Sequence, residues 1–135
     1  MTERPGGSDV QNSETVAVYS PLPSKEKAGK SSFDDGDWLV SGYKFFCSAT
    51  DADIALMLAK TESGKLSLFV APTKKVVKGE DGEDRLVTNG VRFHRLKTKM
   101  GTKELPTAEL ELQGVRAVSP SRRRKPAYTH TKTRC

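Results

Sequence analysis

The sequence predicts an all-β fold, a small antiparallel β-barrel or sandwich of about six to eight strands. Short runs rich in β-branched and aromatic residues alternate with turn signals made of Gly, Pro, Asn and Ser. No segment sustains the 3.6-residue apolar period of a helix, and the chain has no internal repeat. Its 135 residues, of which 35% are hydrophobic, fit one domain with a single core.

The first half of the chain contains three candidate strands. Residues 15–19 are β-branched and aromatic, and a polar loop with several Pro and Gly residues follows at residues 20–37. Residues 38–40 and 43–46 have the composition of strands. The Ser41-Gly42 pair between them indicates either a tight turn or a bulge.

The most apolar run lies at residues 53–60 and predicts a buried strand. Its composition also allows a helix, which Ser63-Gly64 would end early. Residues 62–65 have the composition of a hairpin turn that leads into a strand at residues 66–71. Pro72 closes that strand because proline has no N–H to donate.

The second half contains a polar insertion and two further strands. Residues 73–83 are rich in Lys, Gly and acidic side chains and predict a polar insertion. Asn89-Gly90 introduces a strand at residues 91–96, and residues 108–112 alternate with Leu110 and Leu112 on one face.

The net charge of +6 lies entirely at the C-terminal end. Residues 119–135 contain six basic and no acidic side chains, whereas residues 1–118 contain 17 of each. The end has no apolar pattern that could offset its ordering entropy. We therefore expect one domain at residues 1–118 and a disordered basic tail at residues 119–135.

Several classes of protein and site are excluded by what the sequence lacks. No run approaches the ~18 apolar residues of a membrane-spanning helix, and the N-terminus lacks the apolar core of a signal peptide. An intracellular location is the default expectation. Cys47 and Cys135 alone make no disulfide framework, and no Cys/His spacing suits zinc.

The N-terminal block, residues 1–10, is the most informative stretch of the sequence. Its Gly6-Gly7 pair allows close approach of the backbone to a ligand, or a positive φ. Ser8 and Asp9 could cap a turn or present a hydroxyl and N–H groups to an anion. By itself this block favours an ordinary Gly-Gly turn in a flexible N-terminus over a ligand site.

Two further blocks, taken together with the first, form a pattern that can be compared with known families. They are Gly-Tyr-Lys-Phe-Phe-Cys-Ser-Ala at residues 42–49, and Arg-Leu-Lys-Thr-Lys-Met-Gly-Thr at residues 95–102, with Pro-Thr-Ala-Glu-Leu after it at residues 106–110. In this order and spacing the three blocks resemble the middle β-barrel domain of the acyl-CoA dehydrogenase family over residues 1–118. Gly-Gly-Ser-Asp-Val at residues 6–10 and the aromatic pair after Lys44 resemble most the DNA-alkylation-response (adaptive response) branch.

The resemblance implies an FAD site on this barrel. Met1 and Thr2 match the segment that contacts the flavin ring, where an N–H or O–H helps to stabilise its reduced, anionic form. Gly7 and Ser8 match positions near the pyrophosphate. Lys103 departs from the pattern, since it stands near a position where the family prefers Arg.

The second block supplies two more positions of that site. Phe46 stands where the family usually has Trp, an aromatic wall on the isoalloxazine. Ser48 matches the hydroxyl that hydrogen-bonds flavin N5, the atom that receives the hydride. Taken without the resemblance, Phe46 could be barrel core and Ser48 a loop cap.

Four neighbouring features have a structural interpretation. Lys44 is expected to be structural or solvent-facing, since a strand lysine usually lies on a solvated face. Cys47 should point opposite to Phe46 and Ser48 and be a buried small hydrophobe. His94 is interpreted as an ordinary strand histidine, and residues 107–109 as a substrate-side contact or an edge strand.

The implied activity is an FAD-dependent oxidoreductase acting on CH–CH groups of an acyl-CoA-like substrate, in a homo-oligomeric enzyme. The family places helical domains before and after this barrel, and the second supplies the catalytic base. We expect this chain to lack both, to be inactive alone, and to bind FAD weakly or not at all. The change of composition after Val118 is typical of a truncated or frameshifted gene.

Two alternatives come from other classes. The basic tail could neutralise phosphates and make the chain a non-specific, salt-sensitive nucleic-acid-binding module. Tyr128 is the one aromatic residue of the tail that could stack on a base. A catalytically dead barrel that serves as an interaction module is the other alternative.

Overall fold

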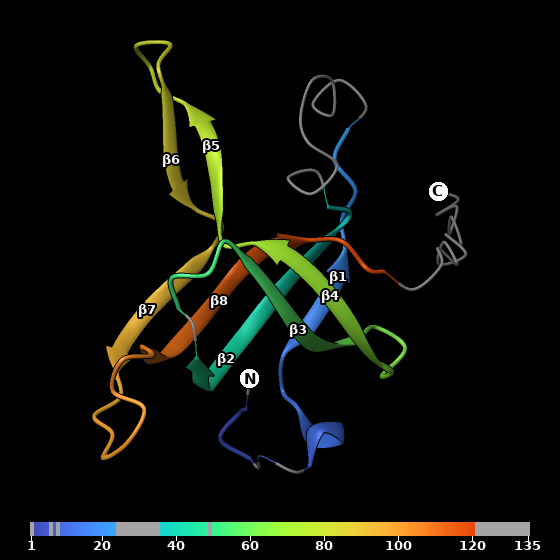
Figure 1. Ribbon diagram of the computed structural model, residues 1–135. Helices are drawn as coiled ribbons and strands as arrows, with labels where there is room; N and C mark the ends of the chain where they lie inside the picture. Colours follow the sequence, from blue (N-terminus) through green and yellow to red (C-terminus); the bar gives the residue numbers. More distant parts are fainter. Residues whose placement is uncertain (1, 6, 8, 24–35, 49, 121–135) are drawn as a thin grey trace.

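The computed structural model describes residues 2–5, 7, 9–23, 36–48 and 50–120. Within these residues there are eight strands and one short 3-10 turn, and no helix long and apolar enough to cross a membrane. The predicted tail lies outside the described residues except for Ser119 and Pro120. The elements are η1 (Val10–Asn12), β1 (Val16–Tyr19), β2 (Trp38–Ser48), β3 (Ile54–Thr61), β4 (Leu66–Pro72), β5 (Lys74–Lys78), β6 (Asp84–Thr88), β7 (Val91–Leu96) and β8 (Thr107–Ala117), as Figure 1 shows.

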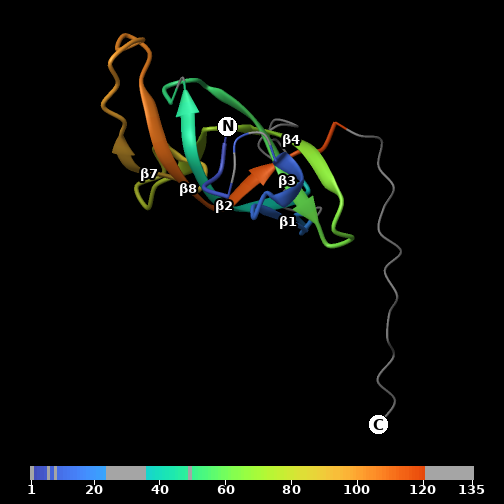
Figure 2. The ribbon, with the colours of Figure 1, turned by 90° about the horizontal axis from the view of Figure 1, so that it is seen from below.

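Six strands form one sheet in the order β4-β3-β1-β2-β8-β7, and β5 pairs with β6 in a separate ribbon. Val70 and Val118 exchange two backbone hydrogen bonds of 2.8 Å, which join β4 to the chain just after β8. This contact closes β4, β3, β1, β2 and β8 into a small barrel. In Figure 2, β7, β8 and β2 follow one another on the left and β1, β3 and β4 lie on the right.

The all-β prediction is confirmed, with one difference in strand direction. All strand pairs are antiparallel except β1 and β3, which are parallel. The reason is topological: β2 runs back beside β1, and β3 then returns to the other edge of β1 instead of pairing with β2.

The barrel interior is filled by side chains that alternate inward along the strands. Phe69 is fully buried and packs edge-to-face against Trp38, with ring centroids 5.4 Å apart. The buried apolar core consists of Ala17, Val40, Cys47, Met57, Ala59, Phe69, Ala71, Val91, Ala108, Leu110, Leu112, Val115 and Ala117.

Strand β2 settles the alternative at Ser41-Gly42 in favour of a bulge. The chain continues as one strand of 11 residues, and its pairing with β8 shifts register between Val40 and Gly42. At this point the backbone approaches Thr15 closely, since a Cβ at Gly42 would lie 2.5 Å from Thr15 Oγ1. The apolar run predicted at residues 53–60 forms strand β3 (Ile54–Thr61), so the helical alternative is wrong.

The polar insertion expected at residues 73–83 contains strand β5, which forms a hairpin with β6. This hairpin extends away from the barrel (Figure 1). Its base is held by Asn89, whose side chain donates to the carbonyls of Pro72 and Arg116 at 2.8 and 2.9 Å. Lys-Lys-Val-Val-Lys is polar by composition, and only its pairing with β6 makes it a strand.

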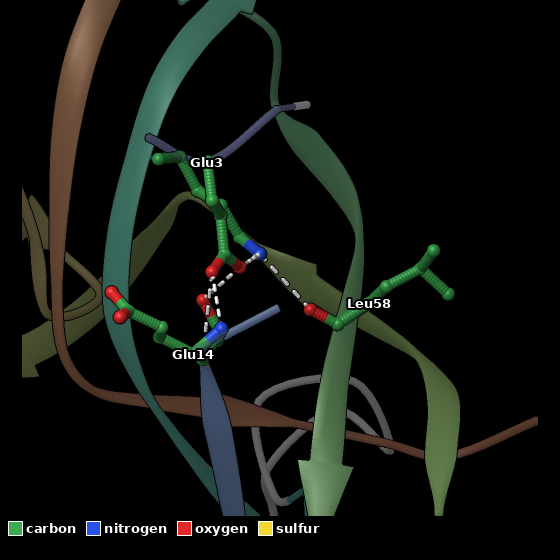
Figure 3. A network of polar contacts seen from close by, with 5 residues as sticks. Glu3, Glu14 and Leu58 are labelled. Carbon is green, nitrogen blue, oxygen red and sulfur yellow. Dashed lines mark hydrogen bonds and ion pairs between the residues drawn. The ribbon is translucent and has the colours of Figure 1, made fainter. Parts of the chain in front are cut away.

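A buried ion pair ties the N-terminal segment to strands β2 and β3 and to the residues just before β1. Glu3 Oε1 accepts from Lys44 Nζ at 2.5 Å and from Thr15 Oγ1 at 2.6 Å, and Glu3 Oε2 accepts from the Glu14 N–H at 2.5 Å. Lys44 Nζ also donates to the Leu58 carbonyl at 3.0 Å, and Figure 3 shows this network. Lys44 is 2% exposed, so the solvent-facing alternative is wrong.

The carboxylate of Glu3 is ionised in this environment. Burial opposes its ionisation, but hydrogen bonds from Lys44, Thr15 and the Glu14 N–H outweigh burial and hold the pKa of Glu3 below its usual value. The lysine therefore sits beside a charged partner instead of being desolvated alone.

Removing Lys44 alone should destabilise the fold strongly. Lys44→Met leaves the Glu3 carboxylate buried without its cation, and we expect a loss of about 3–5 kcal/mol in the free energy of unfolding, measured in urea. The control is Arg85→Met, which removes the exposed Arg85–Asp81 pair and should cost about 0.3–0.5 kcal/mol. Equal losses in the two variants would contradict the structural role of the buried pair.

A side chain at Gly42 should also destabilise the barrel. The Cβ of Gly42→Ala would meet Thr15 Oγ1 at 2.5 Å and Thr15 Cα at 2.7 Å, and we expect a loss of about 1–3 kcal/mol from overpacking. Gly101→Ala is the control, since nothing lies within 4 Å of a Cβ there. Thermal unfolding of the two variants checks this, and an unchanged melting temperature for Gly42→Ala would refute it.

Candidate functional site

The N-terminal segment lies against the end of β2. The N–H of Thr2 donates to the Phe46 carbonyl at 3.2 Å, and the N–H of Phe45 donates to the Thr2 carbonyl at 2.7 Å. Gly7 is close by, since a Cβ there would lie 3.6 Å from Thr2 Cγ2. Glu3, the next residue along from Thr2, is anchored in the barrel, and this anchor sets where Thr2 meets the strand.

The end of β2 presents Phe46 and Ser48 to solvent and Cys47 to the interior. The Phe46 ring is 43% exposed and Cys47 is 3% exposed, which confirms the predicted alternation. Phe46 is therefore not barrel core. Burial raises the pKa of the Cys47 thiol, as expected for an inert buried cysteine. Ser48 Oγ lies 3.2 Å from Thr107 Oγ1 on the neighbouring strand β8.

Four of the six predicted site residues are thus gathered at one end of the barrel: Thr2, Gly7, Phe46 and Ser48. Met1 and Ser8 lie outside the described residues. The backbone N–H of Thr2 donates to the Phe46 carbonyl and is therefore engaged within the barrel. An exposed ring with hydroxyl groups beside it can take a planar heteroaromatic molecule by stacking and hydrogen bonding.

A second polar cluster next to this end was not predicted. Its centre is Glu109, which is 5% exposed and accepts hydrogen bonds from Tyr43 Oη, Lys97 Nζ and, at 3.2 Å, Arg95 Nε. Lys97 Nζ also lies 3.5 Å from the centroid of the Phe45 ring and 4.7 Å from that of Phe46. These residues come from three strands and the segment after β7, so only the register of β2, β8 and β7 brings them together.

Hydrogen bonds within this cluster shift the pKa values of Glu109 and Tyr43 in opposite directions. The hydrogen bonds from Lys97 and Tyr43 lower the pKa of Glu109 to about 2. In turn, the bond to the Glu109 carboxylate raises the pKa of the Tyr43 hydroxyl. Glu109 is therefore a fixed anion and not a proton acceptor near neutral pH.

Two neighbouring expectations are also resolved. Residues 107–109 do not form an edge strand, because β8 lies between β2 and β7. His94 is a strand histidine on β7, as expected, and its Nε2 lies 3.2 Å from Glu111 Oε2.

Comparison with known proteins gives the context of this site. The family model for the acyl-CoA dehydrogenase middle domain matches residues 1–115. Two relatives are acyl-CoA dehydrogenase family member 11 of Caenorhabditis elegans, 40% identical over 124 residues, and AidB of Escherichia coli (strain K12), 34% identical over 113 residues. Each match covers 84% of this chain, which spans only 17% of the length of either relative.

Solved structures agree with these matches. The structure described as Bd2924 in its apo form is similar with a TM-score of 0.66 and 40% identity, over 88% of this chain and 22% of that one. The structure of ACDH-11 of C. elegans in complex with C11-CoA is similar with a TM-score of 0.62 and 38% identity, over 88% of this chain and 18% of that one.

The Glu109 cluster should make stability depend on acidity. A carboxyl whose pKa is depressed on folding stabilises the protein above its unfolded pKa, and this contribution is lost as pH falls toward the folded value. We expect the melting temperature of Glu109→Gln to fall less steeply between pH 4.5 and about 2 than that of the unmodified chain. Glu62→Gln, in the exposed β3–β4 turn, is the control. Parallel curves for Glu109→Gln and the unmodified chain would count against the cluster.

Proposed function

The chain belongs to the acyl-CoA dehydrogenase family as its middle domain, and on that premise we propose that it forms the FAD-binding wall of a flavoprotein oxidoreductase acting on acyl thioesters. The observation that supports this most directly is the meeting of Thr2, Phe46 and Ser48 at one end of the barrel. These are the residues that the family pattern assigns to the flavin.

The chemistry of these side chains fits a flavin. Phe46 is an exposed aromatic ring, so it can stack on the isoalloxazine without any rearrangement of the core. Ser48 follows two residues later on the same side of β2, and its hydroxyl can hydrogen-bond a ring nitrogen. When bound, FAD would supply the hydride acceptor, and this chain would orient the ring and hold it against the barrel.

The described carboxylates nearest to this site are unsuited to act as the base for the α-proton. Glu3 is buried in its network with Lys44, and Glu109 is held ionised by Lys97 and Tyr43. A base that removes an α-proton must be positioned and free to accept it. We therefore propose that a further part of the enzyme supplies the base, and that this chain alone has no dehydrogenase activity.

The outer face of β1, β3 and β4 supports a place for that further part. Val16, Val18, Ile54, Leu56 and Leu68 point outward from these adjacent strands and are 42–61% exposed. Strand β3 is apolar on both faces, which is typical of a strand covered on both sides. Helical domains of the full-length enzyme would cover this face, in line with the small share of its relatives that the chain spans.

The substrate class follows from the family and from one relative. ACDH-11 was solved with C11-CoA bound, which is an acyl thioester of coenzyme A. We propose an acyl-CoA-like substrate for the full-length enzyme on this basis.

Binding of FAD can be mapped by NMR even when it is weak. We expect millimolar FAD to shift the amide signals of Thr2, Gly7, Phe46 and Ser48. Phe46→Ala should weaken binding roughly 2- to 10-fold, the worth of one aromatic contact. Phe93→Ala is the matched control, because Phe93 is a 50% exposed phenylalanine on β7.

Three results would count against the proposal. Shifts confined to another face would place the ligand elsewhere, and the absence of any shift would remove the site. Equal weakening by Phe46→Ala and Phe93→Ala would show that the ring at residue 46 has no special role. A chain purified with stoichiometric FAD would contradict only the expectation of weak binding.

A further inference from the structure

A pocket of about 630 Å³ opens beside the Glu109 cluster. Its described lining consists of Arg4, Phe45, His94, Arg95 and Glu109. These residues come from the N-terminal segment and from β2, β7 and β8. Its aromatic lining is Phe45 rather than Phe46, and the family pattern assigns no role to Arg4 or Arg95.

The carboxylate in this pocket is already fully engaged. Glu109 Oε2 accepts from Tyr43, and Oε1 accepts from both Lys97 and Arg95. Glu109 is only 5% exposed, and its ion pair with Lys97 offsets most of its negative charge. It therefore presents little negative charge to a ligand.

Two guanidinium groups remain available for an anion. Arg4 lies over the rings of Tyr43 and Phe45, with its Cζ 5.4 and 5.6 Å from the centroids. Its guanidinium also interacts with the Tyr43 hydroxyl, and it has no carboxylate partner within the described part of the chain. The Arg95 side chain is 70% exposed and uses only its Nε on Glu109. The terminal nitrogens of both groups can donate outward.

The balance of charge around the pocket is positive. Arg4, Arg92, Arg95 and Lys97 are the basic side chains here, and Glu109 and Glu111 are the carboxylates that face them. His94 lies against Glu111 and not toward a further acid. Guanidinium forks bind phosphate oxygens in pairs.

We propose that this pocket binds the phosphate or diphosphate group of a small phosphorylated ligand through Arg4 and Arg95. The aromatic ring of Phe45 holds Arg4 in place and forms the apolar side of the pocket. The same phosphate chemistry is present in free pyrophosphate, in nucleotides and in coenzyme A. This proposal stands on the pocket and its charges and does not rest on flavin binding.

The test is titration of the full chain with inorganic pyrophosphate, followed by NMR at constant ionic strength. Pyrophosphate should shift the signals of Arg4, Phe45, His94 and Arg95. Arg95→Gln and Arg4→Gln should each weaken binding roughly tenfold or more, since each removes charge-assisted hydrogen bonds. Arg85→Gln is the matched control, because Arg85 is an exposed arginine on the distant hairpin strand β6, and it should leave binding unchanged.

Two further comparisons separate specific binding from attraction by charge alone and from unfolding of a variant. Arg4→Lys keeps the charge but loses the fork, and should bind more weakly than the unmodified chain. Arg95→Gln replaces a largely exposed side chain, so its spectrum should retain the dispersion of a folded protein even where Arg4→Gln does not. Equal weakening by Arg85→Gln, or no shift at millimolar pyrophosphate, would overturn the proposal.

Two further titrations identify the source of the phosphate. ADP and coenzyme A that bind more tightly than pyrophosphate through the same two arginines would support a nucleotide-bearing ligand. Equal affinities would support recognition of the phosphates alone. Phe46→Ala should leave pyrophosphate binding unchanged, so that loss of the flavin site and loss of this pocket are told apart.

Discussion

The buried pair of Glu3 and Lys44 is the interaction on which the rest of this structure depends. It places one acid from the N-terminal segment inside the barrel, where Thr15, Glu14 and Lys44 satisfy its oxygens. Through the Leu58 carbonyl the same lysine contacts β3. This ion pair thus connects the N-terminal segment with strands β2 and β3 and with the residues just before β1.

The position of the candidate site follows from this pair. Thr2 precedes Glu3 directly, so anchoring Glu3 brings the backbone of Thr2 into bonding distance of Phe45 and Phe46. The bulge at Gly42 serves the same arrangement, since it lets the backbone of β2 approach Thr15, a member of the Glu3 network. A buried ion pair is a weak source of net stability, but breaking it is costly, and that cost favours a single position of the N-terminal segment.

A second centre of charge, at Glu109, lies on the outward side of β8 and works differently. Its carboxylate is held by the Tyr43 hydroxyl from β2, by Arg95 from β7 and by Lys97 from the segment after β7. The flavin wall at Phe46 and the phosphate pocket at Arg4 are both next to this cluster. The Glu109 cluster can thus hold in place the side chains of both proposed binding surfaces, the flavin wall and the phosphate pocket.

The sequence by itself determined the all-β class, the inward Cys47 between outward Phe46 and Ser48, and the family pattern, because strand alternation and motif spacing are local properties. It did not reveal the burial of Lys44, the strand at residues 74–78, or the cluster around Glu109. Each of these depends on a partner far away in the chain: Glu3 for Lys44, β6 for β5, and the register of β2, β8 and β7 for Glu109. Only the tertiary structure decides such pairings, because closing the barrel selects one register, and with it the partner of every charged side chain.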